Sequence, residues 1–166
     1  MCLGFDPVSA KDARVLILGT LPGEESLAAN EYYANKRNAF WWIMGELIGA
    51  HPDLPYQSRL DLLRKKGIAL WDVCKSAERQ GSLDAKIIKN TVETNDFDSF
   101  LREHAQVKAI IFNGHDAEKL FRRSQYASST WVSRVEKHTL DSTSPTNTIK
   151  KTEKLRRWRD SLATYL

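Results

Sequence analysis

The sequence predicts an α/β domain with a central, mostly parallel four-stranded sheet. Short apolar runs alternate with segments of helical periodicity, the pattern of strands joined by crossover helices. The expected strands are Val15–Leu18, Ile68–Trp71, Val107–Phe112 and, more weakly, Val135–Leu140. A chain of 166 residues is long enough for one domain with a substantial core and short for two, so we expect a single domain over residues 1–166.

Capping residues and helical periodicity predict the helices in chain order. Ser26 is a typical N-cap for a helix that reaches about Tyr33. Asn38 stands directly before a second helix over residues 39–49, and Gly67 is a typical residue just beyond the end of a third. Asn95 is the expected N-cap of a later helix. Helices after the second are expected at residues 56–66, 83–89, 95–104, 116–123 and 151–165, with residues 74–81 irregular.

Composition excludes several classes of protein. Hydrophobic residues make up 42% and charged residues 28%, an ordinary globular balance. No apolar run approaches the roughly 20 residues that a membrane span needs, and the first residues do not resemble a signal peptide. The two cysteines, Cys2 and Cys74, cannot form a disulfide framework, and the four histidines lack metal-ligand spacing. We therefore expect a cytoplasmic or nuclear-type protein without membrane association, metal or cofactor.

Positive charge is concentrated near the C-terminus. The net charge of the chain is +4, whereas residues 149–159 alone carry six basic side chains and one acidic one, which is +5. This segment is either a patch that faces phosphate or the solvated face of a terminal helix. Lys150 and Lys151 are its candidates for DNA contact.

Polar or loop-forming residues follow all four expected strands, at the edge where open α/β sheets bind ligands. The segment Gly19-Thr20-Leu21-Pro22-Gly23 either lets a ligand approach its backbone or is an ordinary turn, and it lacks the Lys-Ser/Thr of a phosphate-binding loop. Asp72 and Asn113 end the second and third strands. The hydroxyl-rich segment Ser142-Thr143-Ser144-Pro145, with Asn147, either holds phosphate or forms a local turn.

An aromatic cluster surrounds the loop before the second helix. Its members, which include Tyr33 and Phe40, either form core or offer faces for base stacking beside Lys36 and Arg37. Asn38 either caps the second helix or turns its amide into a cleft.

Taken together, these segments resemble the uracil-DNA glycosylase superfamily, and most of all its hypoxanthine-DNA glycosylase branch. The resemblance is carried by short motifs in a specific order. They are VLILGTLPG at 15–23, RNAFW at 37–41, GIALWDV at 67–73, FNG at 112–114 and STSPTN at 142–147.

The resemblance implies a three-layer αβα sandwich and a monomeric, monofunctional enzyme. Such enzymes flip a damaged nucleotide out of double-stranded DNA and hydrolyse its N-glycosidic bond without a cofactor. It implies that Asn38 positions the water and that Tyr33 stacks on the base. It also implies base binding by Gly19, Thr20, Leu21, Pro22, Gly23, Phe40 and Asp72. DNA binding is implied for Ser142, Thr143, Ser144, Pro145, Asn147, Lys150 and Lys151.

Two positions depart from the family pattern. Leu21 stands where several branches have a polar residue that positions water, and Ser142 stands where the classical uracil enzymes have a catalytic His. These departures keep three alternatives open: a uracil or mismatch glycosylase, a non-catalytic nucleic-acid-binding domain, and a small-molecule hydrolase.

Asp72 is the candidate for base choice. An ionised carboxylate only accepts hydrogen bonds, so Asp72 would accept from the N1–H of hypoxanthine and repel the N1 lone pair of adenine. The other interpretation is that Asp72 caps the following turn or pairs with Arg79.

Overall fold

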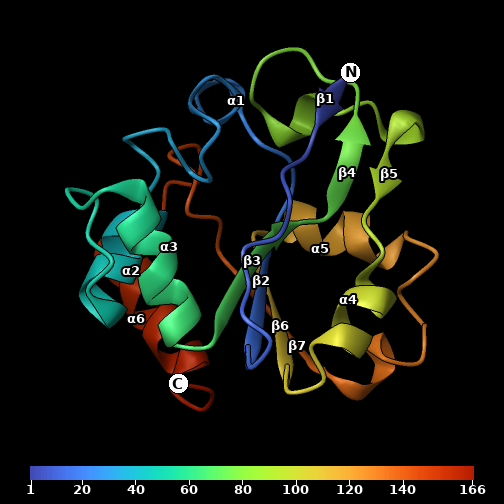
Figure 1. The fold of residues 1–166 in the computed structure, drawn as a ribbon. Coiled ribbons are helices and arrows are strands. Elements are labelled where there is room, and N and C mark those ends of the chain that lie inside the picture. The colour runs from blue at the N-terminus through green and yellow to red at the C-terminus, as the bar shows by residue number, and fades with distance from the viewer.

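The computed structural model describes residues 1–166, and its elements alternate between strands and helices as expected (Figure 1). The strands are β1 (Cys2–Leu3), β2 (Val15–Gly19), β3 (Ile68–Asp72), β4 (Cys74–Ala77), β5 (Glu93–Thr94), β6 (Ala109–Asn113) and β7 (Glu136–Leu140). The α-helices are α1 (Glu24–Ala29), α2 (Phe40–Ile48), α3 (Tyr56–Lys65), α4 (Phe97–Glu103), α5 (His115–Arg122) and α6 (Lys151–Leu162). Short 3-10 helices are η1 (Asp84–Lys86), η2 (Lys89–Thr91) and η3 (Val132–Arg134).

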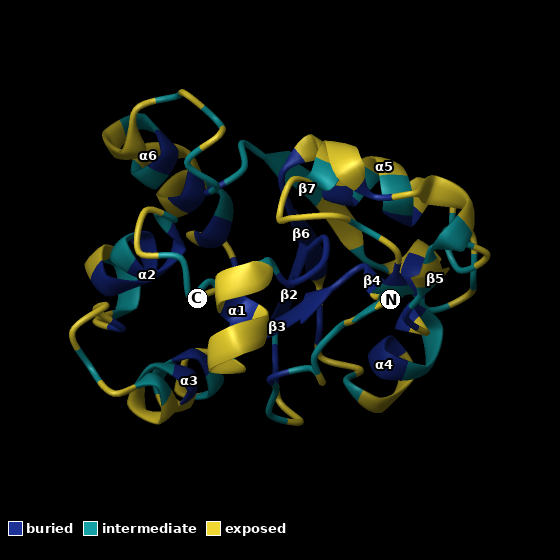
Figure 2. Cartoon of the chain, turned by 90° about the horizontal axis from the view of Figure 1, so that it is seen from above, coloured by how far each residue is buried: buried dark blue, intermediate teal, exposed yellow.

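The main sheet has four strands in the order β3-β2-β6-β7, and every neighbouring pair is parallel. This confirms the predicted fold class. Helices α2, α3 and α6 lie on one face of the sheet, and α4 and α5 lie on the other (Figures 1 and 2). None of the helices is long and apolar enough to cross a membrane.

Alternate residues of the central strands supply two separate cores. Val15 and Ile17 point toward α2, α3 and α6, where they join a cluster that includes Phe40 and Trp158. Leu16 and Leu18 point the other way, into a cluster built around the aromatic side chains of α4 and α5. Because a strand is pleated with a period of two residues, one apolar run can serve both faces.

A small antiparallel sheet in the order β1-β4-β5 adjoins the main sheet at the end of β3. Its central strand β4 lies within residues 74–81, so the expectation of irregular structure there was wrong. The expected helix over residues 83–89 is instead the two 3-10 turns η1 and η2. The η1 segment forms part of one wall of the cavity described below.

Two expected caps were also wrong. The first helix begins after Gly23, and Ser26 lies inside it, where its hydroxyl accepts a hydrogen bond from the Ala34 N–H at 3.1 Å. The cap of α4 is Asp96, which accepts from the Ser99 N–H at 3.0 Å. Asn95 is buried and donates to the backbone oxygen of Asp72 at 2.7 Å.

The cap of α4 gives a test of fold stability. Asp96→Ala removes the acceptor of the Ser99 N–H, so we expect the free energy of unfolding to fall by about 1 kcal/mol. The matched control is Ser99→Ala, which keeps that backbone bond and removes only the bond from the Ser99 hydroxyl to Asp96. Urea unfolding measures both variants, and equal losses would show that the backbone bond is not the stabilising one.

Candidate active site

The carboxyl ends of the four parallel strands meet at one edge of the sheet, below a cavity of about 690 Å³. This volume is within the range of small-ligand sites. The cavity walls come from the segments that follow β2, β3, β6 and β7, together with the α1–α2 connection and the η1 segment. Figure 2 looks onto this end of the sheet, with the exposed surface of α1 in view.

Most residues expected at the site line this one cavity. They are Gly19, Thr20, Leu21, Pro22, Gly23, Tyr33, Asn38, Asp72, Ser142, Thr143, Ser144, Pro145 and Asn147. Phe40, Lys150 and Lys151 are not among the lining residues. Residues separated by more than a hundred positions in the sequence are therefore brought to one place by the parallel sheet.

Gly19, Asp72 and Tyr33 converge on one point of the cavity. Gly19 pairs in register with Asp72 across the β2–β3 ladder. A Cβ atom on Gly19 would lie 2.5 Å from Asp72 Oδ1 and 2.7 Å from Tyr33 Oη. The absence of a side chain at position 19 is therefore what allows the carboxyl and the phenol to approach here.

Asp72 is buried, with 4% of its surface exposed, and its carboxyl makes no hydrogen bond or ion pair within the protein. Burial raises the pKa of Asp72 to about 7, nearby Asp84 contributes to the rise, and Arg79 opposes it. The expectation of a simply ionised carboxylate is therefore wrong, because both forms of Asp72 are present near neutral pH.

The alternative that Asp72 pairs with Arg79 is also wrong. Arg79 donates instead to the backbone oxygens of Leu21, Pro22 and Gly81. It thereby holds the segment after β4 against the Gly19–Gly23 loop. A second contact supports this arrangement, because the Thr20 hydroxyl donates to Asp84 at 3.0 Å.

Leu21 does not offer a polar group to the cavity. Its side chain packs in a small core with Cys74, Ala77 and Ile87. Any water held for chemistry must therefore be bound by a residue other than Leu21.

Tyr33 is the aromatic ring of the cavity, and Phe40 supports it. The two rings are stacked with centroids 4.2 Å apart and planes inclined by 27°. Phe40 is fully buried, so the expected contact between Phe40 and a base can only pass through Tyr33. Tyr33 also has φ of +56°, a conformation that non-glycine residues rarely adopt.

Asn113 joins Tyr33 to the hydroxyl-rich segment 142–147. Its amide donates to Tyr33 Oη at 3.1 Å and to Thr143 Oγ1 at 2.9 Å, and its oxygen accepts from the Thr143 N–H at 2.9 Å. Asn113 was expected only as the end of a strand, with no role in the site. A polar residue directly after a buried strand and before Gly114 is the signal that could have indicated one.

Asn38 both supports helix α2 and lines the cavity. Its Oδ1 accepts from the Phe40 N–H at 2.9 Å, while its Nδ2 makes no hydrogen bond within the protein. The next residue, Ala39, donates its N–H to the backbone oxygen of Thr143 at 2.9 Å. The two expected roles of Asn38 are therefore compatible, since the capping bond fixes an amide that still has free hydrogen-bonding capacity.

Lys154 is a buried lysine beneath the segment 142–147. Only 3% of its surface is exposed, and its ammonium donates to the backbone oxygens of Ser144 at 3.3 Å and Asn147 at 3.1 Å. Burial lowers the pKa of Lys154, and Asp141 opposes the shift. A buried charge is costly unless hydrogen bonds compensate it, so Lys154 ties this segment to α6.

The remaining cations of residues 149–159 divide into paired and unpaired ones. Arg156 pairs with Glu153 and Asp160, and Arg157 pairs with Glu153 and Asp141. Lys150 and Lys151 have no acidic partner, and Lys151 Nζ lies 4.5 Å from the centroid of the Trp42 ring. The exposed cations free to meet phosphate on this side of the cavity are therefore mainly the two lysines at the start of α6.

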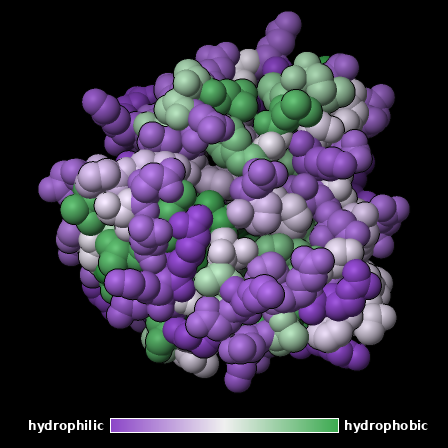
Figure 3. All heavy atoms as spheres, viewed as in Figure 1, coloured by the Kyte–Doolittle hydropathy of each residue, from purple (hydrophilic) through white to green (hydrophobic).

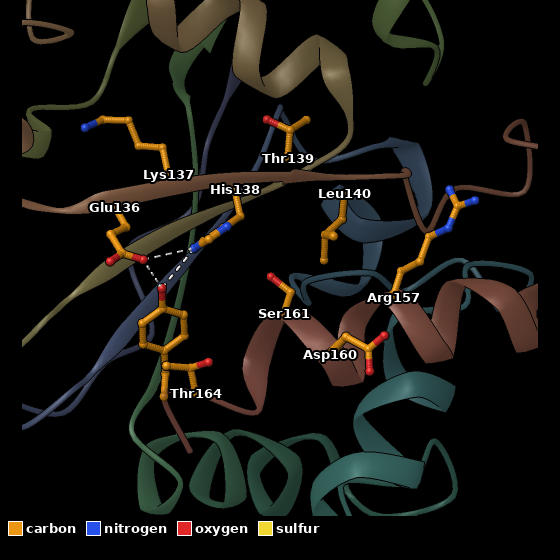
Figure 4. A pocket seen from close by; sticks show the side chains of 10 residues that line it. Glu136, Lys137, His138, Thr139, Leu140, Arg157, Asp160, Ser161 and Thr164 are labelled. Atoms are coloured by element: carbon orange, nitrogen blue, oxygen red, sulfur yellow. Dashed lines mark hydrogen bonds and ion pairs between the residues drawn. The ribbon is translucent and has the colours of Figure 1, made fainter.

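The remaining surface offers no comparable site. Figure 3 shows one largely hydrophilic face of the molecule, with hydrophobic residues gathered near the upper edge. A second hollow lies between β7 and α6, where Glu136 accepts from the Tyr165 hydroxyl and His138 contacts both (Figure 4). These polar groups are satisfied by one another.

Comparisons with known proteins agree with this geometry. A family model for the uracil DNA glycosylase superfamily matches residues 5–163. A protein of Methanosarcina barkeri (strain Fusaro / DSM 804) named hypoxanthine DNA glycosylase is 41% identical over 113 residues, covering 67% of this chain and 70% of that protein. One of the same name from Methanosarcina acetivorans is 39% identical over 127 residues, covering 74% and 79%.

A solution NMR structure of a uracil DNA glycosylase candidate from Methanosarcina acetivorans has the same fold. It superposes with a TM-score of 0.74 at 33% sequence identity, covering 95% of this chain and 96% of that one. The similarity thus includes the strands, the loops at their carboxyl ends and the terminal helix. The chain belongs to the uracil DNA glycosylase superfamily.

Proposed function

We propose that this protein is a DNA glycosylase that releases hypoxanthine from deoxyinosine in double-stranded DNA, as the first step of base excision repair. The observation that carries the proposal is the amide of Asn38, fixed by its bond to the Phe40 N–H, in the same cavity as the ring of Tyr33. The names of the two relatives support hypoxanthine as the base.

The cavity supplies what glycosidic hydrolysis requires. A base inside a duplex is stacked, so the nucleotide must rotate out before an enzyme can act on it. The ring of Tyr33, supported by Phe40, offers a surface on which the flipped base stacks. The free hydrogen-bonding groups of Asn38 then hold a water molecule against C1′ of the sugar, where positive charge develops.

DNA is held on the side of the cavity formed by residues 142–147 and the start of α6. Hydroxyl groups and backbone N–H groups of this segment suit phosphate oxygens, and Lys150 and Lys151 add positive charge. The α6 N-terminus contributes the positive end of its helix dipole.

A panel of duplexes tests the activity. Duplexes that contain deoxyinosine, deoxyuridine, deoxyxanthosine or mismatched thymidine are incubated with the protein and then treated with alkali. We expect strand scission at deoxyinosine only after alkali, because a monofunctional glycosylase leaves an abasic site. Scission only at deoxyuridine would identify a uracil enzyme. Retention of the deoxyinosine duplex on the protein with no base release would identify a binding domain.

Asn38→Ala tests the catalytic assignment. We expect base excision to fall by at least about a hundredfold, the scale of a lost positioning group. The unfolding free energy should fall by no more than about 1 kcal/mol, the scale of a lost cap. The matched control is Asn35→Ala, which removes the equivalent bond from the Arg37 N–H in the same loop. A folded Asn38→Ala protein that cleaves at the wild-type rate would refute the assignment.

The two free lysines give a test of DNA binding. We expect Lys150→Ala with Lys151→Ala to weaken binding and to reduce the slope of log K against log salt by roughly 0.9 for each phosphate that the variant no longer neutralises. Arg156→Ala is the control, because Arg156 is already paired with Glu153 and Asp160. Fluorescence anisotropy at several salt concentrations measures both. An unchanged slope in the double variant would return these lysines to an ordinary solvated surface.

A further inference from the structure

Asp72 is an unusual group at the centre of a cavity that faces DNA. It is more than nine-tenths buried, it points to the same place as Tyr33 Oη, and no donor satisfies its carboxyl. A buried carboxylate normally has an ion pair or several N–H donors, because burial without them is costly. The groups that could have served are used elsewhere: Arg79 binds backbone oxygens, and the Thr20 hydroxyl donates to Asp84.

We propose that Asp72 meets the base as a neutral carboxylic acid, and that Asp84 is the positioning residue that keeps it in that form. This inference rests on the proposed function, since it assigns the protonation state of a group in the same cavity. It adds to that function a hydrogen-bond donor for the departing base and a defined dependence on pH.

The charged surroundings of Asp72 favour the neutral form. Asp84 on η1 is the nearest anion, and it is itself close to Asp116 on α5. Arg79 is the one cation whose charge lowers the pKa of Asp72, against burial and Asp84, which raise it to about 7. The phenols of Tyr32 and Tyr33 and the thiol of Cys74 have raised pKa values, so they stay uncharged.

Further ionisable groups line the outer cavity and complete the surroundings. Glu25 on α1 and Asp116 are acidic, while Arg37 on the α1–α2 connection and His115 on α5 are basic. Neither of these basic residues contributes to the shift of Asp72, whose electrostatic causes are Asp84 and Arg79. The inner cavity therefore offers a second carboxylate and one occupied guanidinium as the neighbours that set the protonation of Asp72.

The neutral acid matches the edge of hypoxanthine better than a carboxylate does. That edge presents N1–H as a donor and O6 as an acceptor. The carbonyl oxygen of a carboxylic acid accepts from N1–H while its hydroxyl donates to O6, whereas an ionised carboxylate can only accept. Adenine presents the opposite pattern, an acceptor at N1 and a donor at its amino group.

The same proton assists bond breaking. The C1′–N9 bond breaks with its electron pair going to the base, the water oxygen bonds to C1′, and the proton that the water loses ends on the released base. Negative charge grows on the base during this step, part of it at O6. The Asp72 hydroxyl stabilises that charge, whereas a carboxylate would repel it. Asp72 keeps its own proton throughout.

The dependence on pH follows directly. The pKa of Asp72 is raised, so the active form is present below that pKa and is lost as pH rises through it. Asp84 contributes to the raised pKa, so its replacement by a neutral residue moves the loss of activity to lower pH. An amide at position 72 has one acceptor and one donor group and does not titrate, so it removes this loss.

Single-turnover excision from a deoxyinosine duplex tests the proposal. For the wild type we expect the rate to fall roughly tenfold per pH unit above the pKa. For Asp84→Asn the fall should begin at lower pH by about one pH unit. For Asp72→Asn this alkaline fall should disappear while activity is retained. The control is Asp53→Asn, an exposed residue in the α2–α3 loop, which should keep the wild-type profile.

Several outcomes would overturn the inference. They are a wild-type rate that rises through this range, an Asp84→Asn profile equal to the wild type, and a folded Asp72→Asn protein that is inactive at every pH. Carboxyl NMR of the free protein gives a second readout. A titration of Asp72 well above the ordinary range that moves down in Asp84→Asn supports the inference, and an ordinary titration contradicts it. A wild type that releases no hypoxanthine at any pH refutes the proposed function instead, and the NMR titration still decides the state of Asp72.

Discussion

The site depends on the hydrogen bonds of one amide. Asn113, at the end of β6, contacts both Tyr33 and Thr143 and uses its donor and its acceptor for them. Tyr33 comes from the connection before α2, and Thr143 comes from the segment after β7. Without this bridge nothing polar would couple the ring in the cavity to the segment proposed to hold DNA. A buried network of this kind is stabilising only when every member is satisfied, which explains why the groups around Asn113 are so closely specified.

The distribution of charge separates the two tasks of the protein. Free lysines lie outside the cavity, at the start of α6, whereas carboxyl groups lie within it. A phosphate is therefore attracted to the rim and disfavoured in the interior, and only an uncharged base gains by entering. The pairing of Arg157 with Asp141 fits this arrangement, because it neutralises the one carboxylate next to the hydroxyl-rich segment.

The strands were predictable within one or two residues, because each is an apolar run bounded by glycine or a polar residue. Strand β4 was not, since its sequence Cys-Lys-Ser-Ala has no β-branched residue and it pairs with β1 from the far end of the chain. The caps show a related limit. Ser26 does accept a backbone N–H, but from Ala34 rather than from its own helix. Local rules identified the chemistry of such groups and not their partners.

The residues of the site divide in the same way. Asn38, Tyr33 and Asp72 were identified by motif and by position at strand ends. The role of Asn113 depends on contacts across 30 and 80 residues. Lys154 belongs to a basic segment that suggests solvent exposure, and nothing local indicates that its ammonium is buried. The protonation of Asp72 was misjudged for the same reason, because it is set by burial and by Asp84 rather than by residue type.

The buried ammonium of Lys154 has a consequence for how the molecule is assembled. It is the last helix, not the sheet, that supplies the internal support of the segment between Ser144 and Asn147. A chain lacking α6 would still contain every residue of the strand ends and of the α1–α2 connection. It would be missing the brace behind the loop proposed to contact DNA. Recognition of the lesion and grip on the duplex are thus separable properties, and the grip belongs to the final sixteen residues of the chain.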